Sequence, residues 1–146
     1  MTDDRNAMNQ QVIDEFRTNG GIVGGFFEGK TLLLLHHTGA KSNKPYTSPL
    51  AAFPQPDGTW AIVASNGGRD DHPAWYFNLQ THPETTVELP TGAGATTTRP
   101  VKARITKDAE RDAIFAVVKT TIPGFADYEK ATEREIPVVV LEWVEA

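Results

Sequence analysis

The stretch IVASNGGRDDHPAWYFNL, Ile62–Leu79, decides the fold and the position of a site. A buried strand is predicted over Trp60–Ala64, and Pro73 suits the first turn of a helix, where its missing N–H costs nothing. Between them, Gly67 and Gly68 allow positive φ and bring backbone amides close to a ligand. A strand, a glycine turn and a helix can place N–H donors beside an anionic or carbonyl-rich ligand. An ordinary strand-to-helix connection is the alternative.

Composition limits the class of protein. The 146 residues contain no cysteine, which excludes disulfides and thiolate metal sites. The length predicts one domain over residues 1–146, in which residues 1–29 form an N-terminal helix and a Gly-rich connector. The net charge of −5 argues against a nucleic-acid partner. No apolar run reaches the ~20 residues of a membrane helix, and the N-terminus has no leader pattern. We therefore expect a cytoplasmic protein with no integral membrane segment.

Hydrophobic periodicity predicts a mainly β fold with helices. Hairpin turns at Thr38–Lys44 and at Asp57-Gly58 imply a mostly antiparallel sheet. About six strands could close into a small barrel with helices against its ends. The expected strands are Thr31–His37, Pro45–Phe53, Trp60–Ala64, Thr85–Leu89, Thr96–Ile105 and Pro137–Trp143, and the expected helices are Met8–Asn19, Pro73–Thr81, Ala109–Thr120 and Phe125–Thr132.

Several single residues carry local expectations. Pro49 and Pro100 lack the N–H of a central strand, so each marks an edge or a bulge, and Pro49 could also mark a ligand-facing kink. Thr106 or Asp108 is expected to cap the helix that follows them. His36 and His37 are adjacent in a strand and point to opposite faces, so they cannot chelate one metal together. His72 and His82 add no ligand spacing, and no metal site is expected.

Lys41, Ser42 and Lys44 offer two cations and a hydroxyl within one turn. A solvated hairpin is one interpretation, and an anion site for a phosphate or carboxylate tail is the other. The Gly20–Gly29 stretch, with Phe26-Phe27 inside it, reads either as a connector or as a lid over a site.

Three stretches together resemble the deazaflavin-dependent nitroreductase family. These small oxidoreductases have a split β-barrel fold related to flavin-binding reductases. The resemblance spans nearly the whole chain from Thr31 onward. It is carried by LLLL…TGAKSNKP…PL between Leu32 and Leu50, by VASNGG…HPAWYFNL…HP between Val63 and Pro83, and by ER…PGFADY…TEREIPV between Glu110 and Val138.

The resemblance implies reduced coenzyme F420 as hydride donor and a small acceptor such as an enone, a quinone or a nitro compound. The phosphate and glutamate tail would lie at Lys41, Ser42 and Lys44. A proton for the reduced acceptor could come from Ser65 or Tyr128, although each side chain is equally explained as structural. The implied cofactor-binding residues are Lys41, Ser42, Lys44, Pro49, Ala64, Ser65, Asn66, Gly67, Gly68, Trp75 and Asn78.

The sequence departs from the family pattern mostly where charge matters. Members often have arginine at the positions of Ala40 and Tyr46, lysine at Asn66 and a basic residue at Asp71. Phe125 stands where relatives tend to carry tyrosine. Fewer cations leave open an FMN-dependent reductase of the same fold, because FMN has one phosphate and no polyglutamate. A non-catalytic cofactor-binding protein is a further alternative, and the chain could be a monomer or a homodimer.

Overall fold

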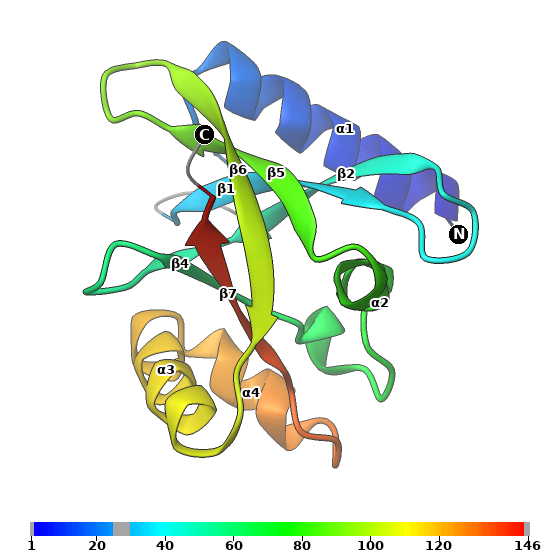
Figure 1. The fold of residues 1–146 in the computed structure, drawn as a ribbon, viewed down its shortest axis with the longest axis vertical. Coiled ribbons are helices and arrows are strands. Elements are labelled where there is room, and N and C mark those ends of the chain that lie inside the picture. The colour runs from blue at the N-terminus through cyan, green and yellow to red at the C-terminus, as the bar shows by residue number, and fades with distance from the viewer. Residues whose placement is uncertain (1, 25–29, 145–146) are drawn as a thin grey trace.

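A computed structural model describes residues 2–24 and 30–144, with side chains from residue 9 onward. Its centre is one seven-stranded sheet in the order β2-β1-β5-β6-β7-β4-β3, in which all neighbours are antiparallel (Figure 1). The expected mainly β, antiparallel architecture is therefore confirmed. The strands are β1 Leu32–Thr38, β2 Pro45–Ala51, β3 Phe53–Pro54, β4 Trp60–Val63, β5 Glu84–Pro90, β6 Thr96–Ile105 and β7 Val138–Trp143.

The sheet curls because the continuous segment of β2 and β3 forms both of its edges. β2 pairs with β1 at one edge, whereas β3 pairs with β4 at the other, and only Ala52 separates β2 from β3. β2 also contacts β4 directly. The expected single strand Pro45–Phe53 is thus two strands, and the chain crosses from one edge to the other at Ala52. This crossing gives the sheet the shape of a half-barrel.

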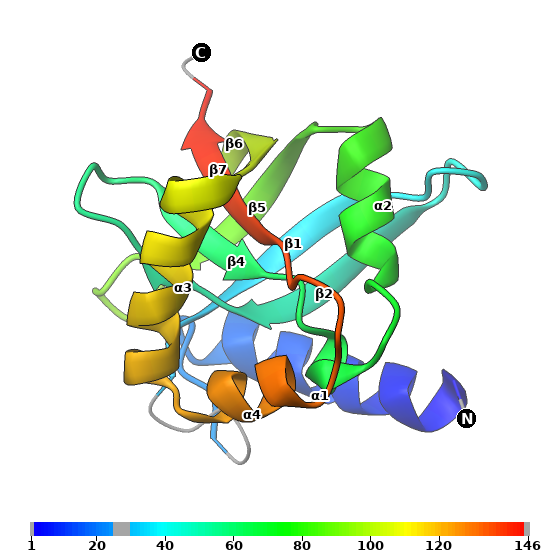
Figure 2. The same cartoon turned by 90° about the horizontal axis from the view of Figure 1, so that it is seen from below.

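In the described residues, four α-helices and one short 3₁₀ turn surround the sheet (Figure 2). Helix α1 contacts β2, α2 contacts β1, α3 contacts β7, and α4 contacts both α3 and η2. Within residues 2–24 and 30–144 no helix is both long and apolar enough to cross a membrane. The helices are α1 Thr2–Thr18, η2 Asn66–Gly68, α2 Ala74–Thr81, α3 Asp108–Thr121 and α4 Gly124–Lys130.

Both faces of the sheet are covered, which explains the four consecutive leucines of β1. Leu33 and Leu35 belong to the cluster that packs against α2, whereas Leu32 and Leu34 pack against Phe16 of α1. A third cluster joins α3 and α4 to β4 and β7. Side chains alternate along a strand, so an unbroken apolar run requires cover on both sides.

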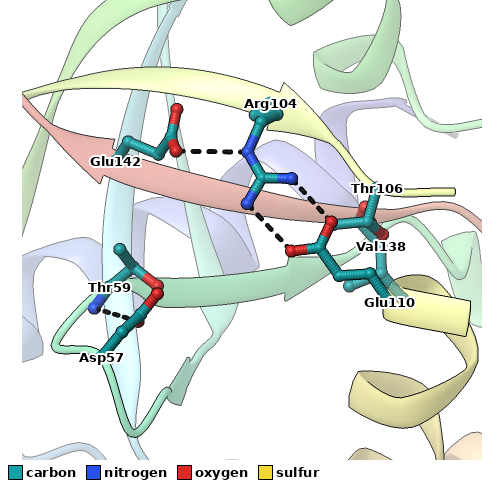
Figure 3. A network of polar contacts seen from close by, with 7 residues as sticks. All are labelled: Asp57, Thr59, Arg104, Thr106, Glu110, Val138 and Glu142. Carbon is teal, nitrogen blue, oxygen red and sulfur yellow. Dashed lines mark hydrogen bonds and ion pairs between the residues drawn. The ribbon is translucent and has the colours of Figure 1, made fainter.

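A polar network fastens α3 to the sheet (Figure 3). The Arg104 guanidinium donates two hydrogen bonds to Glu110 at 2.7 and 3.0 Å and one to Glu142 at 3.2 Å.

The expected cap of α3 is wrong: Lys107 occupies the N-cap without a side-chain bond. The Thr106 hydroxyl instead donates to the Val138 carbonyl oxygen at 2.8 Å, because Thr106 is buried against β7.

Candidate functional site

A cavity of about 1260 Å³ lies among α1, β2, the turn after β4 and α4. Its volume is above the range of about 300–1,000 Å³ that is typical of small-molecule pockets, so a large organic ligand has room in it. Pro49 lies in its wall on β2, which is an edge strand as expected for this proline. The cavity wall includes Lys30, His37, Tyr46, Ser48, Pro49, Ser65, Asn66, Gly67, Arg69, Asp71, His72, Trp75, Phe125 and Tyr128.

The glycine turn has three consecutive residues in the left-handed region. The φ angles are 49° at Asn66, 66° at Gly67 and 84° at Gly68. A Cβ on Gly67 would meet nothing within 4 Å, whereas one on Gly68 would lie 3.1 Å from the Cα of Tyr128. The backbone at Gly67 is therefore open to the cavity, and Gly68 lets the turn press against α4. Gly67 thus has its backbone at the cavity wall, whereas the Gly68 amide donates to the Ser65 carbonyl oxygen at 2.9 Å and Gly68 lies outside the wall.

Arg134 holds this turn in place from outside the cavity. Its Nη2 donates to the carbonyl oxygens of Ser65 at 2.9 Å and Ala64 at 3.2 Å, and its Nε donates to that of Arg69 at 2.9 Å. Its Nη1 lies 2.9 Å from Nδ1 of His72. Burial lowers the pKa of His72, and the charge of Arg134 lowers it further. This role of Arg134 was not predicted from the sequence, because it depends on contacts across 62 to 70 positions of the chain.

A second polar group lies where β1 faces β2. Nε2 of His37 is 2.9 Å from Oγ of Ser48, and Nδ1 of His37 is 2.9 Å from Nδ2 of Asn78. Oδ1 of Asn78 accepts a hydrogen bond from the Ala40 amide at 2.9 Å. Burial, followed by the neighbouring His36, lowers the pKa of His37 to about 4, so its imidazole is neutral at pH 7. Neither His37 nor Ser48 was singled out as a binding residue from the sequence.

Aromatic rings provide the apolar wall. Trp75 and Phe125 are buried, and Phe125 meets Tyr128 edge-on at 5.5 Å between ring centroids. Tyr46 is half-exposed and stacks on His37 at 5.6 Å with an interplanar angle of 23°. Such rings can cover the face of a flat heteroaromatic ligand.

The charges of the wall are mixed. Lys30 and Arg69 contribute cations, and Asp71 contributes a carboxylate. Aromatic faces, open backbone at Gly67 and two cations suit a flat, carbonyl-bearing ring with an anionic tail. The residues that are present therefore fit a deazaflavin. In the part of the chain that the structure describes, no three His, Cys, Asp or Glu side chains gather as metal ligands would.

The structure brings six of the sequence-predicted residues to the cavity and leaves six away from it. Asn78 is buried behind the wall, where it binds His37 and Ala40. In the β1–β2 turn, the Ser42 hydroxyl accepts a hydrogen bond from the Lys44 amide at 3.2 Å. In the wall are Pro49, Ser65, Asn66, Gly67, Trp75 and Tyr128; outside it are Lys41, Ser42 and Lys44, which are exposed, and Ala64, Gly68 and Asn78, which are buried.

Known proteins of similar sequence and fold include F420H(2)-dependent reductases. An F420H(2)-dependent quinone reductase of Mycobacterium tuberculosis (strain ATCC 25618 / H37Rv) is 32% identical over 128 residues, which cover 86% of this chain and 83% of the relative. A solved F420-H2 dependent reductase is 34% identical, has a TM-score of 0.65, and covers 76% of this chain and 93% of its own. A solved domain-swapped dimer is 30% identical and has a TM-score of 0.67; the match covers 97% of this chain and 98% of that chain.

The sequence pattern of one protein family matches almost the whole described chain. Residues 8–143 match the family of the F420H(2)-dependent quinone reductases. The match includes every residue of the cavity wall discussed above. The chain therefore belongs to the F420H(2)-dependent quinone reductase family.

Proposed function

We propose that this protein uses reduced coenzyme F420 to reduce a quinone-type small molecule bound in the cavity. Its membership of an F420H(2)-dependent family identifies the protein as a reductase and F420 as its cofactor. The observation that carries the proposal is the cavity itself, where the turn Ser65–Gly67 meets Trp75 and Phe125. We extend the acceptor range to enones and nitro compounds, and we assign the curled sheet to the split-barrel type.

The cavity residues have distinct proposed roles. The bound cofactor would supply a hydride, and the protein would bind, orient and exclude water. Ser65, Asn66 and Gly67 would contact the ring system, with Trp75 and Pro49 as its walls. Three buried residues, Ala64, Gly68 and Asn78, would act indirectly by shaping the turn and the β1–β2 connection.

One proton must accompany the hydride. A quinone that accepts a hydride gains two electrons and one hydrogen, and it needs one further proton to become the hydroquinone. Ser65 and Tyr128 are our candidates, since both line the cavity. Ser65 is 8% exposed, whereas Tyr128 is half-buried. Tyr128 is therefore the side chain that bulk water can re-protonate more easily.

The test begins with binding. Fluorescence titration with oxidised F420 and, separately, with FMN should show tighter binding of F420. Anaerobic mixing of the protein and F420H2 with menadione, cyclohexenone or a nitroimidazole should then reoxidise the cofactor. Tight binding of FMN without binding of F420 would show that the cofactor is a flavin and not a deazaflavin. Cofactor binding without reoxidation by any acceptor would favour a carrier.

A further inference from the structure

The Ser48 hydroxyl has an orientation that can be deduced from its neighbours. The backbone N–H of Ala40 can only donate a hydrogen bond. It donates to one end of the Asn78 amide, so that end is the oxygen, Oδ1. The other end is Nδ2, which can only donate. This assignment removes the usual ambiguity of an amide side chain.

The amide then fixes the proton on His37. Nδ2 of Asn78 lies 2.9 Å from Nδ1 of His37, so Nδ1 must accept and carries no proton. A neutral imidazole has one N–H, which therefore lies on Nε2. Nε2 faces Oγ of Ser48 at 2.9 Å. His37 thus donates to Ser48, and the Ser48 hydroxyl proton points elsewhere.

The direction left for that proton is the cavity. Ser48 lines the cavity wall and is half-buried. Among the residues whose side chains the structure describes, the Ser48 hydroxyl contacts no hydrogen-bonding group other than His37. A hydroxyl that accepts a hydrogen bond from the protein and does not donate its own proton to the protein can donate that proton to a ligand.

We propose that Ser48 is a binding residue that donates a hydrogen bond to a carbonyl-type oxygen in the cavity, with His37 and Asn78 as positioning residues. This inference rests on the proposed function, because the oxygen would belong to the deazaflavin ring or to the quinone-type acceptor. Both offer the same chemistry, a carbonyl oxygen that gains negative charge in its reduced or reacting form. A donor held in place in advance stabilises such charge without reorganisation.

The same geometry limits what the Asn78–His37–Ser48 group can do. In a serine hydrolase the histidine takes a proton from the serine. Here Nε2 already carries its proton, so His37 cannot activate Ser48 as a nucleophile. Ser48 is also a poor proton source, because resupply from His37 would leave an imidazolate. The group is a fixed donor, and proton delivery remains with Ser65 or Tyr128.

The first test is a direct observation of the tautomer. Long-range ¹H–¹⁵N NMR of the ligand-free wild type at pH 7 should show His37 protonated at Nε2 and unprotonated at Nδ1. Asn78→Asp should reverse this, because a carboxylate cannot donate to Nδ1 and accepts from it instead. Nε2 would then accept from Ser48 and withdraw its hydroxyl from the cavity. The opposite tautomer in the wild type would overturn the inference, whether or not the protein binds F420.

The second test measures ligand contact. Ser48→Ala should weaken either oxidised-F420 binding or kcat with menadione by about 10-fold, the usual size for one hydrogen bond of this kind. Ser48→Thr should restore most of the loss, since it keeps the hydroxyl. Thr98→Ala, which removes an exposed hydroxyl from β6 outside the cavity wall, is the control.

The pattern of the effect identifies the oxygen. A loss of F420 affinity places it on the cofactor, and an unchanged affinity with lower kcat places it on the acceptor. A wild type that binds and turns over, while Ser48→Ala matches it in affinity, KM and kcat, would refute the inference alone. A wild type that binds no F420 would refute the proposed function and, with it, the ligand assigned to Ser48.

Discussion

Gly67 and Gly68 are adjacent and both have positive φ, yet their surroundings differ. Gly67 faces open space, whereas a Cβ on Gly68 would lie 3.0 Å from Cβ of Ala131 and 3.1 Å from Cα of Tyr128. Alanine at either position bears the cost of the left-handed conformation, about 1 kcal/mol. At Gly68 it also collides with backbone that cannot rotate away.

We therefore expect Gly68→Ala to be much more harmful than Gly67→Ala. Gly67→Ala should lower the free energy of unfolding by about 1 kcal/mol. Gly68→Ala should lower it by about 3 kcal/mol, because overpacking adds to the backbone cost. Urea denaturation of the two variants measures both values, and Gly67→Ala is the matched control. Equal losses would mean that α4 can move away from the turn.

At the scale of elements, one carboxylate attaches α1 to the sheet. Glu88 of β5 is 8% exposed and accepts hydrogen bonds from Arg17 of α1 at 2.7 and 3.0 Å. His36 of β1 contacts the same carboxylate at 2.7 Å. The hydrogen bond from Arg17 is the main cause that lowers the pKa of Glu88, and the contact with His36 adds to it.

Glu88→Gln should destabilise the protein in a pH-dependent way. A charged hydrogen bond of this kind is worth about 1.5 kcal/mol. The folded pKa of Glu88 lies below its unfolded value, so its contribution is complete above the unfolded pKa and is lost as pH falls through the folded one. The wild type should exceed Glu88→Gln in stability above about pH 5, and the difference should shrink towards pH 3.

The exposed Glu84→Gln on the same strand is the control, and it should leave stability unchanged at every pH. Urea denaturation between pH 3 and pH 7 measures the three proteins. A difference between wild type and Glu88→Gln that stays constant with pH would show that shape, and not charge, matters at Glu88.

Most elements could be predicted from the sequence, and the errors have tertiary causes. The alternation of Thr96–Ile105 predicted β6 at its correct bounds. Pro100, however, lies in an inner strand and not at an edge. Its carbonyl accepts from the Val144 amide at 3.1 Å, just past the end of β7, so its missing N–H falls where the β6–β7 ladder ends. Nothing local in the sequence shows where a neighbouring strand stops.

At the scale of the molecule, the sequence predicted residues of the cavity wall mainly where they lie close together in the chain. Ser65, Asn66, Gly67 and Trp75 belong to one stretch of the sequence, and all four line the cavity. Arg134 and the pair of His37 and Ser48 were missed, because their roles arise from contacts between distant strands and loops. F420 dependence followed from motifs across the chain and agrees with the family found.

The position of the anionic tail depends on charges that are spread over the whole molecule. The chain carries a net charge of −5, which repels a polyanion at long range. Local cations must offset this repulsion. Lys41 and Lys44 are exposed on the β1–β2 turn, outside the cavity wall, whereas Lys30 and Arg69 lie in it. A tail that leaves the cavity at Tyr46 would reach the turn lysines next.

We expect the double change Lys41→Ala/Lys44→Ala to weaken F420 binding about 3- to 10-fold, because each exposed charge contact contributes at most about 1 kcal/mol. The loss should diminish in 1 M salt, where the screening length falls to about 3 Å. Lys102→Ala/Lys107→Ala, which removes two exposed lysines outside the cavity wall, is the control in the same fluorescence titration. If the turn variant binds F420 like the wild type at low salt, the tail lies instead towards Lys30 and Arg69, and the turn is a solvated hairpin.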